Sequence, residues 1–265
     1  MGEEYRITIP GILERIPDVC DAVVAAARRS GFNERAVYHC QMAVDEACTN
    51  IVEHGYGMAQ QVGQIEVIYR NEPDRCVITI ADNGPPFNPL AREDPDPTMA
   101  LSDRKPGGWG IYFIKKMMDE TSYTYENGRN YLTIVKLKTP QNMAPAARTT
   151  ADTGIAVHTL TGSVREISPS GRLDSNAAPD LQAVLDAQLD DGHVHLIVNM
   201  TDISYISTSG LKVLVNAWRR ARDASGNVAL VGLKPQILEV FETVGFDQIF
   251  SIFDTTDEAL KALYK

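Results

Sequence analysis

Apolar positions in the first half of the chain alternate with polar ones over short runs and recur every three to four residues elsewhere. The alternation predicts strands and the longer period predicts helices. The expected strands are Tyr5–Ile9, Gln64–Tyr69, Arg75–Ala81, Thr121–Glu126 and Asn130–Lys138. The expected helices end near Arg29, run from Asn33 to His54, and cover Ile111–Asp119. Asn33 is a suitable N-cap, and Asn127-Gly128 predicts a hairpin turn.

Residues 139–153 read TPQNMAPAARTTADT and show no apolar period, which is typical of a linker. After them strands and helices alternate, which predicts a mixed α/β domain. The strands are expected near Ile155–Thr159, Val164–Ser168, His193–Val198 and Val228–Val231. The helices are expected at Ala177–Leu189, after Gly210, and at Pro235–Val244 and Thr256–Leu263. We therefore expect one domain over residues 1–139, a linker over 140–153 and a second domain over 154–265.

Composition narrows the function classes. The 265 residues carry a formal net charge of −10, which disfavours bulk nucleic-acid binding and points to proteins or small ligands as partners. No apolar run approaches the roughly 20 residues of a membrane span, and the start MGEEYRITIP is unlike a signal peptide. The four cysteines form no C-x-x-C pair and are expected to be buried free thiols. These features together predict a cytoplasmic protein.

Three polar constellations in the first half could carry chemistry. On the helix ending at His54, Glu46, Asn50 and His54 are spaced by four and share one face. An amide oxygen beside a carboxylate can hold a nucleotide-bound magnesium ion and position a proton acceptor. Taken alone, the same spacing is also typical of a solvated helix face.

The second constellation is Asp82-Asn83-Gly84, which follows a predicted strand. Its carboxylate could accept a hydrogen bond from a base amino group, although such a sequence is also a common surface turn. The third is the run 107–111, GGWGI, before a helix, where free backbone N–H groups bind phosphate. Arg104 and Lys105 add positive charge beside it, and a flexible hinge is the alternative interpretation.

In this order the three runs resemble the N, G1 and G2 boxes of the Bergerat-type ATP-binding fold, which DNA gyrase, histidine kinases and heat-shock chaperones share. The sequence pattern DEACTN…HGY…DNGPPF…GGWGI is similar to that of anti-sigma-factor serine kinases, and the resemblance covers about residues 4–138. A histidine kinase is the nearest alternative, but the ATP domain begins within the first ten residues, before any phospho-accepting hairpin. Gyrase-like and chaperone-like ATPases require a transducer domain, which the second half does not resemble.

The resemblance implies a role for each matching residue. Glu46 is the implied general base and Asn50 the implied magnesium ligand. Asp82 is implied to bind the adenine amino group. The other implied nucleotide contacts are Gly84 at the base, Lys105, Gly108 and Gly110 at the phosphates, and Thr133 at the adenine. Pro86 departs from the family, because a second glycine usually stands there, and it stiffens the loop.

In the second half, Ser207, Thr208 and Ser209 gather hydroxyls where a helix begins, and simple capping is the structural interpretation. Residues 154–264 resemble a STAS domain of the anti-sigma-factor antagonists through GRLDS, ISYISTSGLKVL and VALVGL…VFETVGFDQIF. The family's phosphate acceptor then corresponds to Thr208, with Ser209 and Ser207 as the next choices. Threonine for serine and Asn199 for aspartate are departures from the family.

The expected fold is therefore α+β: a Bergerat-type ATP-binding α/β sandwich followed by a small α/β STAS domain. The leading hypothesis is an ATP- and Mg²⁺-dependent protein serine/threonine kinase that phosphorylates a STAS hydroxyl, its own or another protein's, in partner switching. The resemblance further implies a sigma factor, a PP2C-type phosphatase and a second copy of the chain as partners. The alternatives are a non-catalytic ATP-binding docking protein and a plain ATPase.

Overall fold

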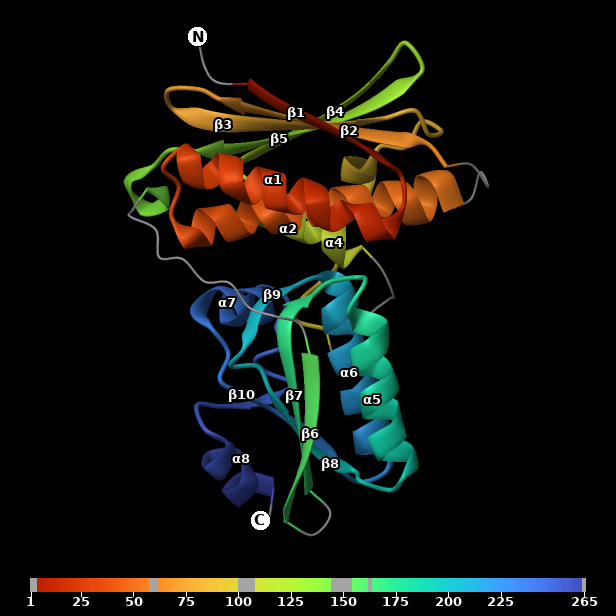
Figure 1. The fold of residues 1–265 in the computed structure, drawn as a ribbon, viewed down its shortest axis with the longest axis vertical. Coiled ribbons are helices and arrows are strands. Elements are labelled where there is room, and N and C mark those ends of the chain that lie inside the picture. Colours follow the sequence, from red (N-terminus) through yellow and green to blue (C-terminus); the bar gives the residue numbers. More distant parts are fainter. Residues whose placement is uncertain (1–3, 58–61, 100–107, 144–153, 162–163, 264–265) are drawn as a thin grey trace. The chain divides into compact units, whose positions relative to one another are not determined.

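The computed structural model describes residues 4–57, 62–99, 108–143, 154–161 and 164–263. These fall into two compact units, the first carrying strands β1–β5 and the second strands β6–β11 (Figure 1). Each unit is described by itself below. None of the helices in the described part of the chain has the length and hydropathy that a membrane crossing requires.

The first unit is an antiparallel sheet with strand order β1-β2-β3-β5-β4. Its strands are β1 (Glu4–Pro10), β2 (Gln64–Asn71), β3 (Arg75–Asp82), β4 (Glu120–Glu126) and β5 (Arg129–Leu137). Its longer helices are α1 (Ile16–Arg29), α2 (Glu34–Asn50) and α4 (Trp109–Met117). Short helical turns are η1 (Leu13–Arg15), η2 (Ile51–Tyr56), η3 (Pro89–Ala91) and η4 (Pro140–Asn142).

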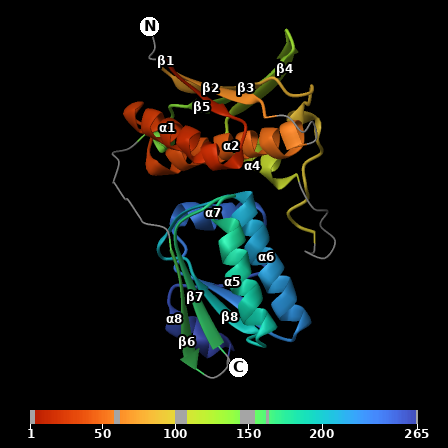
Figure 2. The ribbon, with the colours of Figure 1, turned by 45° about the vertical axis from the view of Figure 1, so that its right-hand side comes forward.

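Figures 1 and 2 show α1, α2 and α4 on one face of this sheet. The core lies between the helices and that face, where alternate residues of β2, β3 and β5 are mostly apolar and buried. Its members include Val19, Val23, Cys40, Val44, Ile65, Val67, Ile78, Ile80 and Ile134. All four cysteines are buried free thiols, as the sequence predicted. Burial of these apolar groups is what holds the helices to the sheet.

Local signals in the first unit were confirmed. The Asn33 side chain accepts the Ala36 N–H at 2.9 Å and so caps α2. Asn127 and Gly128 both have positive φ, 52° and 78°, as the tight hairpin turn requires. The predicted second helix continues past Asn50, but its last turn, η2, is a π-helix.

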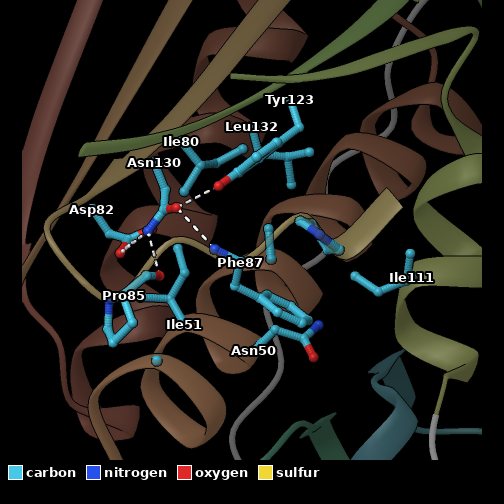
Figure 3. Close-up of a pocket in the computed structure, with 13 residues that line it drawn as sticks. Asn50, Ile51, Ile80, Asp82, Pro85, Phe87, Ile111, Tyr123, Asn130 and Leu132 are labelled. Atoms are coloured by element: carbon cyan, nitrogen blue, oxygen red, sulfur yellow. Dashed lines mark hydrogen bonds between the residues drawn. The ribbon is translucent and has the colours of Figure 1, made fainter. Parts of the chain in front are cut away.

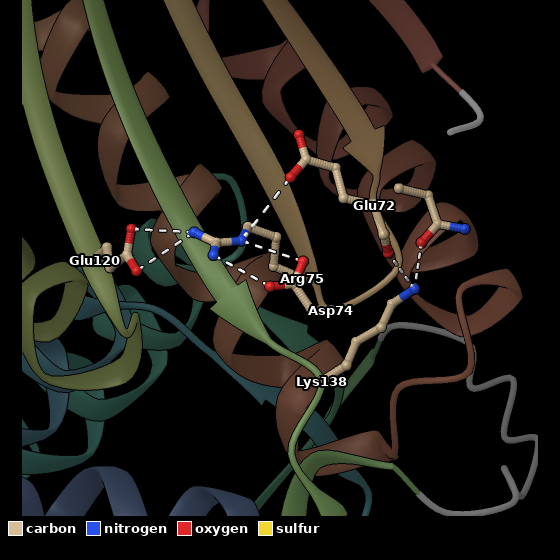
Figure 4. Close-up of polar contacts among 6 residues, drawn as sticks. Glu72, Asp74, Arg75, Glu120 and Lys138 are labelled. Atoms are coloured by element: carbon tan, nitrogen blue, oxygen red, sulfur yellow. Dashed lines mark hydrogen bonds and ion pairs between the residues drawn. The ribbon is translucent and has the colours of Figure 1, made fainter. Parts of the chain in front are cut away.

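The β2–β3 turn is tied to neighbouring strands by charged groups (Figure 4). Arg75 forms ion pairs with Asp74 at 3.1 Å and with Glu120 of β4 at 3.5 Å. Lys138, just after β5, donates to Asn71 Oδ1 at 2.6 Å and to the Glu72 carbonyl at 2.7 Å. These side chains are partly exposed, so solvent screens the pairs and they add little to stability.

The second unit has a mixed sheet with the order β11-β10-β8-β7-β6, in which β9 also pairs with β7. Its strands are β6 (Gly154–Thr161), β7 (Val164–Leu173), β8 (His195–Asn199), β9 (Ile203–Ile206), β10 (Asn227–Val231) and β11 (Ser251–Phe253). Its helices are α5 (Ala178–Asp190), α6 (Thr208–Asp223), α7 (Pro235–Thr243) and α8 (Thr256–Leu263). β6 runs antiparallel to β7, and the other pairs are parallel.

Helices cover both faces of the second sheet. Ala259 of α8 packs with Ile197 and Ala229 on one face. The neighbouring β8 residues Leu196 and Val198 are also buried and point to the other face, because side chains alternate along a strand. α5 and α6 lie side by side in both ribbon views (Figure 2). The strands β9 and β11 were not predicted, because each is only three or four residues long.

Candidate functional site

The first unit contains a pocket where β3 ends and β5 begins (Figure 3). Its lining is mostly apolar, with a few polar groups: Ala47, Asn50, Ile51, Gly55, Ile80, Asp82, Pro85, Phe87, Pro89, Ile111, Tyr123, Asn130 and Leu132. Apolar walls with one carboxylate suit a heterocycle that carries an amino group.

Asp82 is the carboxylate of this pocket. It is the last residue of β3 and its side chain is buried, with 5% exposed. Its Oδ1 atom accepts the Gly84 N–H at 2.7 Å and the Asn130 amide at 3.0 Å. Burial raises the pKa of the Asp82 carboxyl, while these two hydrogen bonds oppose the rise. The carboxylate is therefore held in place through one oxygen, and it lines the pocket.

Gly84 lies close to this carboxylate. A Cβ atom at Gly84 would come within 2.8 Å of Asp82 Oδ1. The absence of a side chain at Gly84 therefore lets the backbone turn back on Asp82. The resemblance had implied a different role, in which Gly84 lets the backbone approach the base. Pro86, the departure from the family's glycine, follows Pro85, whose carbonyl accepts from Asn130 at 3.1 Å.

Asn130 is the central polar residue of the pocket, and none of the three sequence motifs contains it. It is the first of the β5 residues whose side chains face the helices, and it is 6% exposed. Its amide nitrogen donates to Asp82 and to the carbonyls of Gly84 and Pro85, at 3.0 to 3.2 Å. Its oxygen accepts the Tyr123 hydroxyl at 2.6 Å and the Phe87 N–H at 3.2 Å (Figure 3). One sequence signal could have found it: Asn130 stands two residues before the apolar Leu132, so the two share the inward face of the predicted strand.

Thr133 is not at the pocket. Asn130 and Leu132 line the pocket, so the alternation along β5 directs Thr133 to the other face of the sheet. There its hydroxyl lies 3.2 Å from that of Thr79 on β3. The pocket lining therefore gives the implied adenine contact of Thr133 no support, and Asn130 is the β5 residue that reaches Asp82.

Glu46 and Asn50 lie one turn apart on α2, with Glu46 buried at 4% exposed. The Asn50 amide nitrogen donates to the Glu46 carbonyl at 2.6 Å, which leaves the amide oxygen as the group able to face a ligand. Asn50 lines the pocket together with Asp82. His54, on the same predicted face, is exposed in the π-helical turn and does not line the pocket.

The glycines before and in α4 have different roles. Gly108 has φ +87° as the N-cap of α4, a conformation that favours glycine, and a Cβ there would meet nothing within 4 Å. A Cβ at Gly110 would lie 2.1 Å from Glu46 Oε2. The start of α4 therefore packs directly on the Glu46 carboxyl group. Arg104, Lys105 and Gly107 lie outside the described residues.

The hydroxyl cluster of the second unit is at the start of α6. Ser207 is the N-cap: its Oγ accepts the Gly210 N–H at 3.4 Å and donates to the Leu173 carbonyl at 3.4 Å. Thr208 is the first helical residue and is 7% exposed, whereas Ser209 is half-buried. The helix begins at Thr208, three residues earlier than predicted. Capping thus uses Ser207 and leaves the hydroxyls of Thr208 and Ser209 in the first turn.

An antiparallel sheet with helices on one face, and a carboxylate-bearing pocket between them, defines the first unit as a Bergerat-type ATP-binding domain. Sequence comparison agrees: residues 9–136 match the histidine kinase-like ATPase domain and residues 157–259 match the STAS domain. The serine-protein kinase RsbW of Bacillus cereus (strain AH187) is 30% identical over 134 residues, 49% of this chain and 82% of that protein. RsbW of Bacillus thuringiensis subsp. konkukian (strain 97-27) is 31% identical over the same shares.

The chain therefore belongs to the family of RsbW-like kinase domains with the histidine kinase-like ATPase fold, here fused to a STAS domain of the anti-sigma-factor-antagonist type. Its second unit is also similar to the solved structure of a putative anti-sigma factor antagonist from Thermotoga maritima. That similarity has 21% sequence identity and a TM-score of 0.40, and covers 42% of this chain and 95% of the other.

Proposed function

We propose that this chain is an ATP-dependent protein serine/threonine kinase that transfers a phosphoryl group to a STAS hydroxyl in partner switching. The observation that carries the proposal is the pocket that Asp82 and Asn50 line, with the Glu46 carboxyl group against the start of α4. A carboxylate able to bind the adenine, an amide oxygen able to hold magnesium, and a proton acceptor together suit phosphoryl transfer from ATP to a hydroxyl.

The nucleotide is held by Asp82 and by the apolar walls of the pocket. The Asp82 oxygen that Asn130 and Gly84 leave free accepts from the adenine amino group, and Ile80 and Leu132 contact the ring. Phosphates extend toward the start of α4, where Gly108 and the N–H groups of the first turn lie.

The Asn50 amide oxygen suits magnesium, because that ion prefers oxygen ligands and keeps several waters. Within the described residues no three His, Cys, Asp or Glu side chains cluster as a metal site. A magnesium ion at Asn50 would take its other ligands from phosphate and water. When bound, magnesium supplies positive charge that neutralises the phosphates. Glu46 takes the proton of the attacking hydroxyl.

Thr208 is the proposed acceptor, with Ser209 and then Ser207 as the next choices. A phosphate at the start of α6 is favoured by the helix dipole, by about 0.3–1 kcal/mol at exposed sites. It adds a charge of about −1.5 to −2, which changes the surface that a partner meets. The proposed partners are a STAS domain, in this chain or another, with a sigma factor and a PP2C-type phosphatase.

A second candidate function is nucleotide-dependent docking without phosphoryl transfer. It is favoured by the low exposure of Thr208 and by the use of Ser207 as a helix cap, since an acceptor hydroxyl must reach the nucleotide. In that case the STAS unit binds a partner, and ATP acts as a signal.

Incubation with magnesium and labelled ATP, followed by mass spectrometry, tests the proposal. We expect a single phosphate within residues 207–209, and none in the Thr208→Ala variant, with Thr208→Ser labelled again. Label elsewhere contradicts the assignment of the acceptor. Nucleotide binding without label on this chain or on an added STAS protein supports the docking function instead.

The direction of transfer is tested by mixing two variants. Residues 140–153 are long enough to span about 50 Å when extended, so chain length does not prevent Thr208 from reaching its own ATP site. We propose transfer within a chain or within a dimer. Mixing Glu46→Gln with Thr208→Ala distinguishes these, because label on the Glu46→Gln chain arises only between chains.

A further inference from the structure

Tyr56 ends the π-helical turn η2, and its ring is enclosed by glycines. A Cβ atom at Gly11 would lie 2.4 Å from the ring, one at Gly63 would lie 2.1 Å from it, and one at Gly84 3.6 Å from it. Gly11 N–H also donates to the Gly63 carbonyl at 2.8 Å. The ring is therefore in contact with the end of β1, the start of β2 and the turn after β3, and any side chain at Gly11 or Gly63 would displace it.

The Tyr56 hydroxyl joins two of these segments. It donates to the Gln64 carbonyl at 2.8 Å and accepts the Asn83 N–H at 3.3 Å. Asn83 lies between Asp82 and Gly84, whose N–H donates to Asp82 Oδ1 at 2.7 Å. One hydroxyl thus connects the first residue of β2 to the turn that fixes the pocket carboxylate.

The geometry points to Tyr56 as a positioning residue for nucleotide binding, which acts by holding the Asp82–Gly84 turn in its binding conformation. This inference rests on the proposed ATP site. The residue that would touch the nucleotide is Asp82, and Tyr56 does not line the pocket. Loss of the hydroxyl frees the Asn83 N–H, so the turn can relax and the Gly84 N–H moves away from the carboxylate.

The position of Tyr56 in the helix supports this role. A π-helical turn adds a residue to the helical repeat and is usually retained for function, since it is less stable than an α-helical turn. Here the turn begins directly after Asn50 and ends at Tyr56. The same helix therefore carries the pocket residue Asn50 at one end of the turn and contacts the Asp82 loop at the other.

Tyr69 provides a matched control. It is also a buried tyrosine of the first unit, 2% exposed, and its hydroxyl lies 2.9 Å from Ser30 Oγ. Neither Tyr69 nor Ser30 lines the pocket. Tyr69→Phe thus removes one buried hydroxyl, with its hydrogen bonds to Ser30 and Cys76, at a distance from Asp82.

The test is ATP binding by calorimetry in the full-length wild type, Tyr56→Phe and Tyr69→Phe, with thermal melts of each. We expect Tyr56→Phe to bind ATP about three- to tenfold more weakly, the loss associated with one hydrogen bond. We expect Tyr69→Phe to bind like the wild type, even if both melt at lower temperature. Equal affinity in the two variants overturns the inference, whereas a wild type that does not bind ATP contradicts the proposed function itself.

A second readout separates positioning from general destabilisation. The titratable and charged groups that interact electrostatically with Asp82 are Cys48 of α2, Tyr56 of η2, Tyr123 of β4 and Arg129 of β5. The Gly84 hydrogen bond lowers the Asp82 pKa, so its loss should raise that pKa. As pH is lowered, Tyr56→Phe should therefore lose ATP binding at a higher pH than the wild type does. An unchanged pH midpoint contradicts positioning. Gly63→Ala, which displaces the ring and keeps the hydroxyl, should weaken binding in the same way and tests the inference if Tyr56→Phe folds poorly.

Discussion

The Asn130 amide nitrogen donates to Asp82 Oδ1 at 3.0 Å, from a strand that lies directly beside β3 in the sheet. The two residues are opposite each other in the β3–β5 pairing. Because Oδ1 also accepts the Gly84 N–H, the orientation of the carboxyl group is set by two donors. The remaining oxygen is thereby defined as the acceptor for a ligand, and this relationship leads to the first three predictions.

Asp82→Asn should abolish most ATP affinity while leaving the fold intact. The variant can keep its side-chain oxygen toward Asn130 and Gly84, which places its NH₂ group where the adenine amino group must donate. Two donors then face each other, and we expect a loss of roughly 1–3 kcal/mol in binding free energy. Calorimetry measures the affinity, and Asp74→Asn on the exposed β2–β3 turn is the control. Unchanged affinity removes Asp82 from the site.

As pH is lowered, ATP affinity should begin to fall at a higher pH than it would if the pKa of Asp82 were that of an ordinary aspartate. Burial raises the Asp82 pKa, so the carboxyl takes up a proton at a higher pH and loses its ability to accept from the base. The same raised pKa makes the charged form costly in the folded state. The contribution of this carboxyl to the free energy of unfolding therefore increases as pH falls through its folded pKa.

These two effects have opposite signs, which gives a specific measurement. Wild-type ATP affinity is titrated downward from neutral pH, and thermal stability is followed over the same range. In Asp82→Asn the pH-dependent contribution of this carboxyl to thermal stability should be absent, since the amide does not titrate. An affinity that is constant through the acidic range contradicts the assignment.

Asn130→Ala should lower both stability and ATP affinity. It removes the donor to Asp82, Gly84 and Pro85, and leaves the Tyr123 hydroxyl and the Phe87 N–H without their acceptor. Buried polar groups left unsatisfied cost about 1–3 kcal/mol each, so we expect a clear decrease in the melting temperature and in affinity. Thr133→Ala, on the opposite face of β5, should leave ATP affinity unchanged. A loss of affinity in Thr133→Ala would restore the implied contact.

Glu46→Gln should retain ATP and lose phosphoryl transfer. The amide keeps the shape that packs against Gly110 but takes no proton, and removal of a general base typically costs about 10²- to 10⁴-fold in rate. Single-turnover transfer to a STAS acceptor gives the rate, and calorimetry gives the affinity. Asn50→Ala should instead weaken magnesium-dependent binding. Transfer by Glu46→Gln at the wild-type rate excludes Glu46 as the base.

Gly110→Ala should disrupt the site through Glu46. The added methyl group would lie 2.1 Å from Glu46 Oε2, so either the carboxyl group or the start of α4 must move. Overpacking of this kind costs about 1–3 kcal/mol, and we expect a lower melting temperature together with loss of transfer. Gly154→Ala is the control, because its Cβ would meet its nearest neighbour at an ordinary 3.5 Å. Full transfer by Gly110→Ala contradicts the close packing.

The sequence by itself determined the element types, the fold class and the family. Local signals act over a few residues, so the Asn33 cap and the Asn127-Gly128 turn could be read directly from the chain. The order of the motifs around Glu46, Asp82 and Gly108 was specific enough to identify the ATP-binding fold. Short strands such as β9 were missed, because four residues contain too few alternations to give a pattern.

The tertiary structure decided which side chains share the pocket. Position on β5 fixes the face of each residue, and a shift of one residue reverses it, so sequence resemblance placed Thr133 at the base where the sheet instead brings Asn130 to Asp82. The contact of Gly110 with Glu46 and the enclosure of Tyr56 join residues tens of positions apart in the chain. Such contacts depend on how helices pack on the sheet, which no local pattern of apolar and polar positions specifies.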